Sequence, residues 1–145
     1  MLASPTVPVS WGELIDKITI LEIKRERIDQ PQAHAHVTQE HRLISETGAL
    51  ALQVEAVRLL ADELRRVNVA LWDVEDAIRE AEAKADFGPE FVGLARLVYL
   101  TNDERAALKR RINDVLGSEL VEEKSYARPT NNAVGGAFTL SAPAR

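Results

Sequence analysis

Two polar residues interrupt an apolar helical stripe in the C-terminal half of the chain. On a helix, spacings of three and four place six side chains on one face: Val98, Thr101, Arg105, Leu108, Ile112 and Val115. Four of the six are apolar, as expected for a stripe that faces a core. Thr101 and Arg105 put a hydroxyl and a guanidinium at core positions, which indicates a polar site beside the core.

Other predicted helices carry polar residues at the margin of an apolar face. Asn68, Trp72, Glu75 and Arg79 follow one another at spacings of four and three. If the helix faces meet, the bundle encloses a polar site, and its predicted ligand-binding residues are Lys17, Asn68, Trp72, Glu75, Asp76, Arg79, Thr101, Asn102, Arg105 and Lys109.

Two interpretations of this polar stripe stay open. A buried, unpaired charge is costly, so these groups should either pair or bind a ligand. In the first interpretation the arginines pair with Asp16, Glu75 and Asp76, and the ion pairs fix helix register. In the second, Arg105, Lys109, Lys17 and Arg79 hold a phosphate or carboxylate.

Thr101 also has a local explanation. The sequence T-N-D-E, from Thr101 to Glu104, matches a capping box, so one helix could end at Leu100 and another begin at Thr101. A helix N-terminus with an arginine one turn later is itself suited to an anion.

Acidic residues raise the alternative of a magnesium enzyme. MazG-type all-helical nucleotide phosphohydrolases bind magnesium through acidic E-x-x-E and E-x-x-D motifs. Here Asp16, Glu75 and Asp76 would be the metal ligands and Arg105 and Lys109 would bind phosphate. The E-x-x-D at Glu13 is better explained by capping. The leading interpretation therefore has no cofactor, and magnesium belongs to the alternative alone.

A run of three histidines, His34, His36 and His41, falls within D-Q-P-Q-A-H-A-H-V-T-Q-E-H. Pro31 and the polar residues around it predict a solvated loop and no metal site.

Composition limits the remaining classes. The 145 residues fit one domain, and the net charge of −5 argues against nucleic acid or an anionic membrane as partner. The absence of cysteine excludes disulfides, thiolate zinc sites and cysteine nucleophiles. We expect no signal peptide and no membrane span, and we predict a cytoplasmic protein.

Capping and periodicity predict the helices. Ser10 and Glu13 form a capping box that begins a helix reaching about Asp29. A long helical pattern runs from about Thr38 to Lys84, with Gly48 as a candidate interruption and a heptad stripe of Leu50, Val57, Leu64, Leu71 and Ile78.

The last predicted helix begins near Pro89, ends at about Leu116 and is capped by Gly117. S-E-L-V-E-E-K-S-Y, residues 118–126, is either a short helix or a docked, strand-like segment. The predicted fold is an all-α antiparallel bundle, built on one long central helix or helix pair, over residues 1–126. Residues 127–145 are predicted to be a weakly structured C-terminal tail.

Four phrases carry a resemblance: VPVSWGELIDKITILEIK, NVALWDVEDAIR, YLTNDERAALKRRIN and GSELVEEKSY. Together, over about residues 7–126, they resemble an uncharacterised family of small bacterial helical proteins. The histidine run and the chain after Tyr126 lie outside this match. The resemblance implies a bacterial cytosolic protein, a link to cell-surface glycan or nucleotide-sugar metabolism, and a glycosyltransferase or tetratricopeptide-repeat protein as partner.

Three hypotheses follow. The first is a non-catalytic module that binds a small anion, such as a sugar phosphate or nucleotide-sugar, or docks a partner. The second is the magnesium-dependent phosphohydrolase. The third is a structural homodimer with no ligand, held by the heptad stripe, and a homo-oligomer is expected in general.

Overall fold

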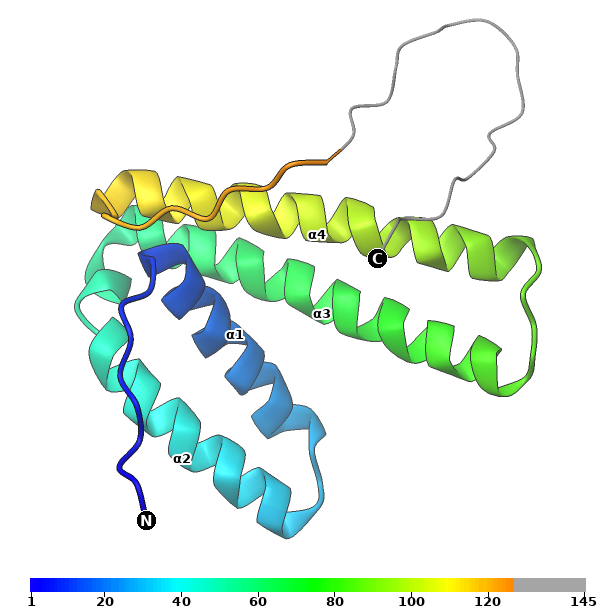
Figure 1. Ribbon diagram of the computed structural model, residues 1–145, viewed down its shortest axis with the longest axis horizontal. Helices are drawn as coiled ribbons and strands as arrows, with labels where there is room; N and C mark the ends of the chain where they lie inside the picture. Colours follow the sequence, from blue (N-terminus) through cyan, green and yellow to red (C-terminus); the bar gives the residue numbers. More distant parts are fainter. Residues whose placement is uncertain (127–145) are drawn as a thin grey trace, which may run out of the picture.

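The computed structural model describes residues 1–126, and the predicted tail at 127–145 lies outside the described residues. This part of the chain is an all-α bundle without strands. Figure 1 shows its four α-helices as two hairpins, α1 (Trp11–Arg27) with α2 (Pro31–Gly48) and α3 (Glu55–Ala83) with α4 (Pro89–Leu116). None of the helices in residues 1–126 combines the length and apolar character needed to cross a membrane.

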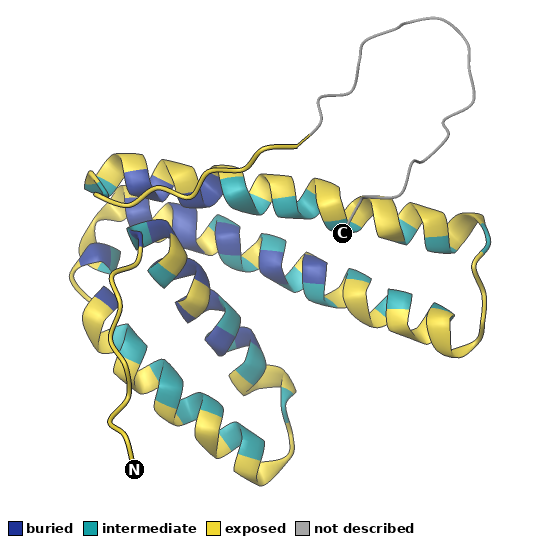
Figure 2. Ribbon diagram, viewed as in Figure 1, coloured by how far each residue is buried: buried dark blue, intermediate teal, exposed yellow. Residues whose placement is uncertain are grey.

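Helix α1 lies at the centre of the packing, since it contacts α2, α3 and α4. Its side chains Ile15, Ile18 and Leu21 are buried, as the isoleucine-rich pattern predicts. Ile15 and Ile18 join Val57, Leu60 and Leu64 of α3 and Leu108 and Ile112 of α4 in one core. Figure 2 shows the buried residues concentrated at the end of the α3–α4 hairpin that α1 covers, while the other end is largely exposed.

The predicted loop at residues 29–41 is wrong, whereas the helical pattern from Thr38 to Lys84 is interrupted after Gly48, the point at which the sequence allowed a break. Pro31 occupies the first turn of α2, where its missing N–H costs nothing, and the Gln30 side chain caps Ala33 N–H at 2.6 Å. The histidines therefore lie on a helix. Helix α2 ends at Gly48, which packs against Ile18, and a 3₁₀ turn (Ala51–Gln53) leads into α3.

The heptad stripe is correct only from Val57 onward. Val57, Leu64 and Leu71 are buried in α3, but Leu50 lies in the connection before the 3₁₀ turn and is 76% exposed. A seven-residue spacing places side chains on one face only if the helix is continuous. The break after Gly48 therefore removes Leu50 from the stripe.

Helix α4 runs unbroken through Thr101, so the predicted helix start at Thr101 is wrong. Gly117 ends α4 in the left-handed conformation, with φ at 61°, as the prediction of a glycine cap requires. Residues 118–126 are extended and run back along α4, as Figure 1 shows, which confirms the docked alternative over a short helix.

Candidate functional site

A buried carboxylate lies where α1, α3 and α4 meet. The Asp16 side chain is 2% exposed and accepts two hydrogen bonds from Arg105, from Nε at 2.9 Å and from Nη2 at 2.5 Å. Asn68 Nδ2 donates to Asp16 Oδ1 at 2.9 Å and to Thr19 Oγ1 at 3.0 Å. We call Asp16, Thr19, Asn68 and Arg105 the Asp16 cluster. Hydrogen bonding to Asp16 raises the pKa of Arg105, so the guanidinium stays charged.

One turn further along α4, Lys109 bridges two glutamates. Its side chain is 9% exposed, and Nζ lies 2.7 Å from a carboxylate oxygen of both Glu13 and Glu122. Burial alone would lower the pKa of Lys109, but hydrogen bonds to Glu122 and Glu13 outweigh burial and raise it. The hydrogen bond from Lys109 lowers the pKa of Glu122. The bridge therefore fastens residues 118–126 and the start of α1 to α4.

The N–H groups of Trp11, Gly12 and Glu13, which have no acceptor within α1, are all satisfied. Ser10 accepts from Glu13 N–H through its side chain and from Leu14 N–H through its backbone. The remaining two come from distant residues: Asn113 Oδ1 accepts from Gly12 N–H at 2.6 Å, and Ser118 Oγ accepts from Trp11 N–H at 3.2 Å. Serine capping is confirmed, whereas the Glu13 side chain pairs with Lys109.

The predicted site residues divide into two groups. Asn68 and Arg105 meet in the Asp16 cluster, Asn102 accepts a long hydrogen bond from Arg105 at 3.5 Å, and Lys109 is the neighbouring bridge. Thr101 is half-buried on α4 beside them.

The other five predicted residues lie outside the cluster. Lys17 is exposed and pairs with Glu40 of α2 at 3.0 Å. Trp72 packs under Arg27, whose Cζ lies 5.8 Å from the ring centroid. Glu75, Asp76 and Arg79 lie on the exposed part of α3, where Arg79 and Glu75 form a loose ion pair of 3.7 Å.

The carboxylates named for magnesium do not share one point. Asp16 is occupied by Arg105 and Asn68, whereas Glu75 and Asp76 are exposed on α3. Within residues 1–126 no three acidic, histidine or cysteine side chains gather as metal ligands would. Two of the histidines contact Arg25, His34 through the backbone carbonyl and His41 through the guanidinium.

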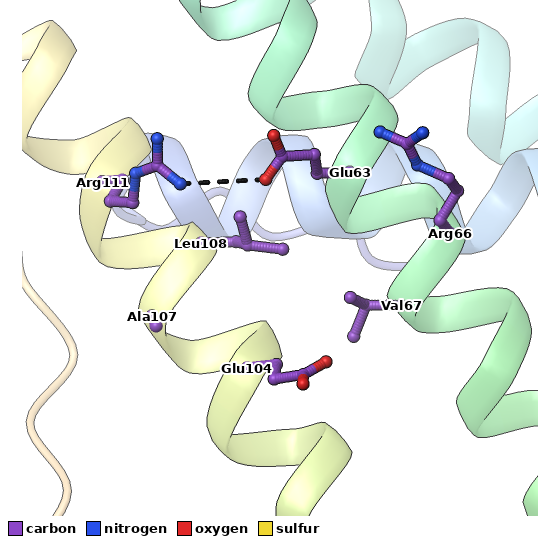
Figure 3. Close-up of a pocket in the computed structure, with 7 residues that line it drawn as sticks. All are labelled: Glu63, Arg66, Val67, Glu104, Ala107, Leu108 and Arg111. Atoms are coloured by element: carbon purple, nitrogen blue, oxygen red, sulfur yellow. Dashed lines mark ion pairs between the residues drawn. The ribbon is translucent and has the colours of Figure 1, made fainter.

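A pocket of about 420 Å³ opens between α3 and α4, and Figure 3 shows the helix α1 behind these two helices. Its lining combines an apolar floor with two acidic and two basic residues: Val67, Ala107, Leu108, Glu63, Glu104, Arg66 and Arg111. The polar stripe predicted from the sequence does not include this pocket. The spacing of Glu104, Ala107 and Arg111 on one helix face was the available signal.

The cations of the Asp16 cluster and of the Lys109 bridge both have carboxylate partners inside the chain. Arg105 has Asp16, and Lys109 has Glu13 and Glu122. The Asp16–Arg105 pair joins α1 to α4, and Asn68 of α3 donates to the same carboxylate. This arrangement corresponds to the ion-pair interpretation of the stripe.

Comparison with known proteins gives one match. A family model described as a family of unknown function (DUF6165) matches residues 6–139. A search of curated proteins and a search of solved structures each returned no match. The match includes the histidine helix and continues to residue 139, so the limits drawn from the four phrases were too narrow.

Proposed function

We propose that this chain, which belongs to the DUF6165 family of unknown function, is a non-catalytic helical scaffold that pairs with a second copy of itself. The observation that carries the proposal is an uncovered face of the α3–α4 hairpin, on the side of the 420 Å³ pocket. The polar stripe supports ligand binding less well, because its buried cations already have carboxylate partners.

The face extends from the pocket along both helices. On α3, small or apolar residues follow Val67 at spacings of three and four and therefore share its side of the helix. On α4, the same spacings lead from Ala107 back through Glu104 to two leucines. We define the α3–α4 face by Val67, Ala70, Val74, Ala77, Leu97, Leu100 and Ala107, with the charged residues Glu63, Arg66, Glu104 and Arg111. Leu97 and Leu100 are 45% and 46% exposed.

Size complementarity favours a second copy as the occupant. The leucines of this face, Leu97 and Leu100, lie on α4, whereas α3 presents the exposed Ala70 and the half-buried Ala77. A two-fold axis that sets α4 of one copy over α3 of the other places leucines against alanines twice. Two helical hairpins packed in this way form a four-helix bundle.

Charge complementarity favours the same occupant. The chain has a net charge of −5, yet the α3–α4 face carries two glutamates and two arginines. Glu63 and Arg111 form a loose pair of 3.7 Å within the chain. Arg66 and Glu104 have no ion-pair partner among residues 1–126, so a two-fold copy can pair them reciprocally, Arg66 of each with Glu104 of the other.

The test is sedimentation velocity of the full chain over a range of concentrations. We expect a monomer–dimer equilibrium in the unaltered chain and a monomer in Leu97→Glu/Leu100→Glu. The matched control is Leu43→Glu/Leu50→Glu, which adds the same charge at exposed leucines of α2 and its following connection. An unaltered chain that stays monomeric at several hundred micromolar contradicts the proposal, as does equal dissociation by both variants.

The finer implications of the family resemblance stay predictions. They are the bacterial origin, the cytoplasmic location, the link to glycan metabolism and a glycosyltransferase or tetratricopeptide-repeat partner. Binding of a sugar phosphate or nucleotide-sugar at the polar stripe is likewise a prediction, and it requires Arg105 or Lys109 to exchange a carboxylate partner for the ligand.

A further inference from the structure

We infer that α4 carries a binding site for an extended acidic peptide, and that residues 118–126 of the chain occupy this site from within. The site consists of Lys109, Arg110 and Asn113 on α4. None of these three residues belongs to the α3–α4 face, although Ala107 borders both surfaces, so the inference does not depend on the proposed dimer.

The contacts between this segment and α4 are mainly polar and charged. Glu122 Oε2 accepts from Lys109 Nζ at 2.7 Å, and Arg110 Nη2 donates to the Glu122 carbonyl at 3.3 Å and to Glu123 Oε2 at 3.1 Å. The apolar side chains of the segment, Leu120 and Val121, are each 44% exposed. Beyond Ser118, which bonds to Trp11 and to the Asn113 carbonyl, two adjacent glutamates and one backbone carbonyl hold the segment on α4.

The surface beneath the segment is a built cationic site. Lys109 is 9% exposed and Asn113 is buried, so their side chains are fixed by the surrounding helices. A pocket of about 210 Å³ remains between α4 and the segment, lined also by Ala106, Ala107 and Lys124. When the segment leaves, Lys109 retains Glu13 alone and Arg110 loses its carboxylate partner among the described residues.

The resident segment indicates the class of ligand. It is extended and presents two consecutive carboxylates together with a backbone carbonyl, and no compact anion offers this combination. An acidic peptide of similar sequence can make the same contacts. The resident segment has the advantage of its short tether at Gly117, which gives it an effective concentration in the millimolar range, so a free peptide competes poorly unless the resident segment is weakened.

The test measures binding of a fluorescein-labelled peptide, SELVEEKSY, to the full chain by fluorescence anisotropy. Glu122→Gln/Glu123→Gln in the protein weakens the resident segment and leaves Lys109 and Arg110 in place. We expect this variant to bind the peptide roughly fivefold more tightly than the unaltered chain does, the gain expected when two partly exposed ion pairs are lost. The matched control is Glu119→Gln, because Glu119 makes no ion pair among residues 1–126 and should leave binding unchanged.

Two further measurements make the result specific. A peptide with glutamine at both glutamate positions, SELVQQKSY, should bind the weakened variant several-fold less well than SELVEEKSY. Adding Arg110→Gln to that variant should reduce binding of SELVEEKSY, and because Arg110 is exposed the protein should stay folded. The inference is overturned if the unaltered chain, Glu122→Gln/Glu123→Gln and the variant with added Arg110→Gln all bind SELVEEKSY equally well. It is also overturned if none of them binds the peptide at millimolar concentration.

Discussion

Replacing Arg105 with methionine tests the buried ion pair most sharply. The Asp16 carboxylate would keep Asn68 as a donor but lose both guanidinium hydrogen bonds, in a position where its side chain is 2% exposed. Removing one member of a buried pair costs roughly 3–5 kcal/mol of unfolding free energy. The Arg105 side chain is 25% exposed, so water can reach this pair and we expect a smaller loss of about 2–3 kcal/mol.

The assay is urea unfolding followed by circular dichroism, at one protein concentration because self-association also contributes to stability. Arg79→Met is the matched control: Arg79 is 78% exposed and its pair with Glu75 is 3.7 Å, so the loss should stay within about 0.5 kcal/mol. Asp16→Asn/Arg105→Met should be more stable than Arg105→Met by about 1 kcal/mol or more, because the unpaired charge is gone. Equal, small losses for Arg105→Met and Arg79→Met would refute the reasoning.

Two further predictions concern the contact of α1 with α4 and residues 118–126. Gly12→Ala should lower the unfolding free energy by about 1–3 kcal/mol, because the new Cβ would overlap the Lys109 carbonyl. In Gly93→Ala the new Cβ meets no atom within 4 Å, so this change should raise the unfolding free energy by about 0.5–1 kcal/mol. Urea unfolding measures both changes. The pKa of Glu122 is lowered and that of Lys109 is raised, so their contact should be lost below the ordinary glutamate value of 4.5 and above the ordinary lysine value of 10.5. A dye on Leu120→Cys should lose anisotropy outside this pH window, and constant anisotropy from pH 3 to 11 would contradict it.

The sequence predicts well what depends on neighbours along the chain. The all-α class, the serine cap of α1, the start of α4 at Pro89 and the glycine cap at Gly117 each follow from a few adjacent residues. Asp16 was available as a partner for Arg105 because helical spacing puts both on core-facing stripes.

The wrong predictions concern where a helix begins or continues, and the missed contacts join residues far apart in the sequence. Pro31 is compatible with a loop or with a first helical turn, and the structure places it in the first turn of α2. The capping box at Thr101 is a local preference, and α4 continues through it because the helix packs against α3 on both sides of that point. Asn113 and Ser118 cap α1 from about a hundred residues away, and no local spacing contains that information.

Mixing two charge-reversed variants tests the proposed dimer most directly. Arg66→Glu alone sets glutamate against Glu104 of the second copy, and Glu104→Arg alone sets arginine against Arg66, so each chain should sediment as a monomer. A mixture of the two restores both reciprocal pairs and should sediment as a heterodimer, with affinity at least about tenfold above either variant alone. If the mixture stays monomeric where the unaltered chain dimerises, or if neither variant is weakened, the α3–α4 face is not the contact between copies.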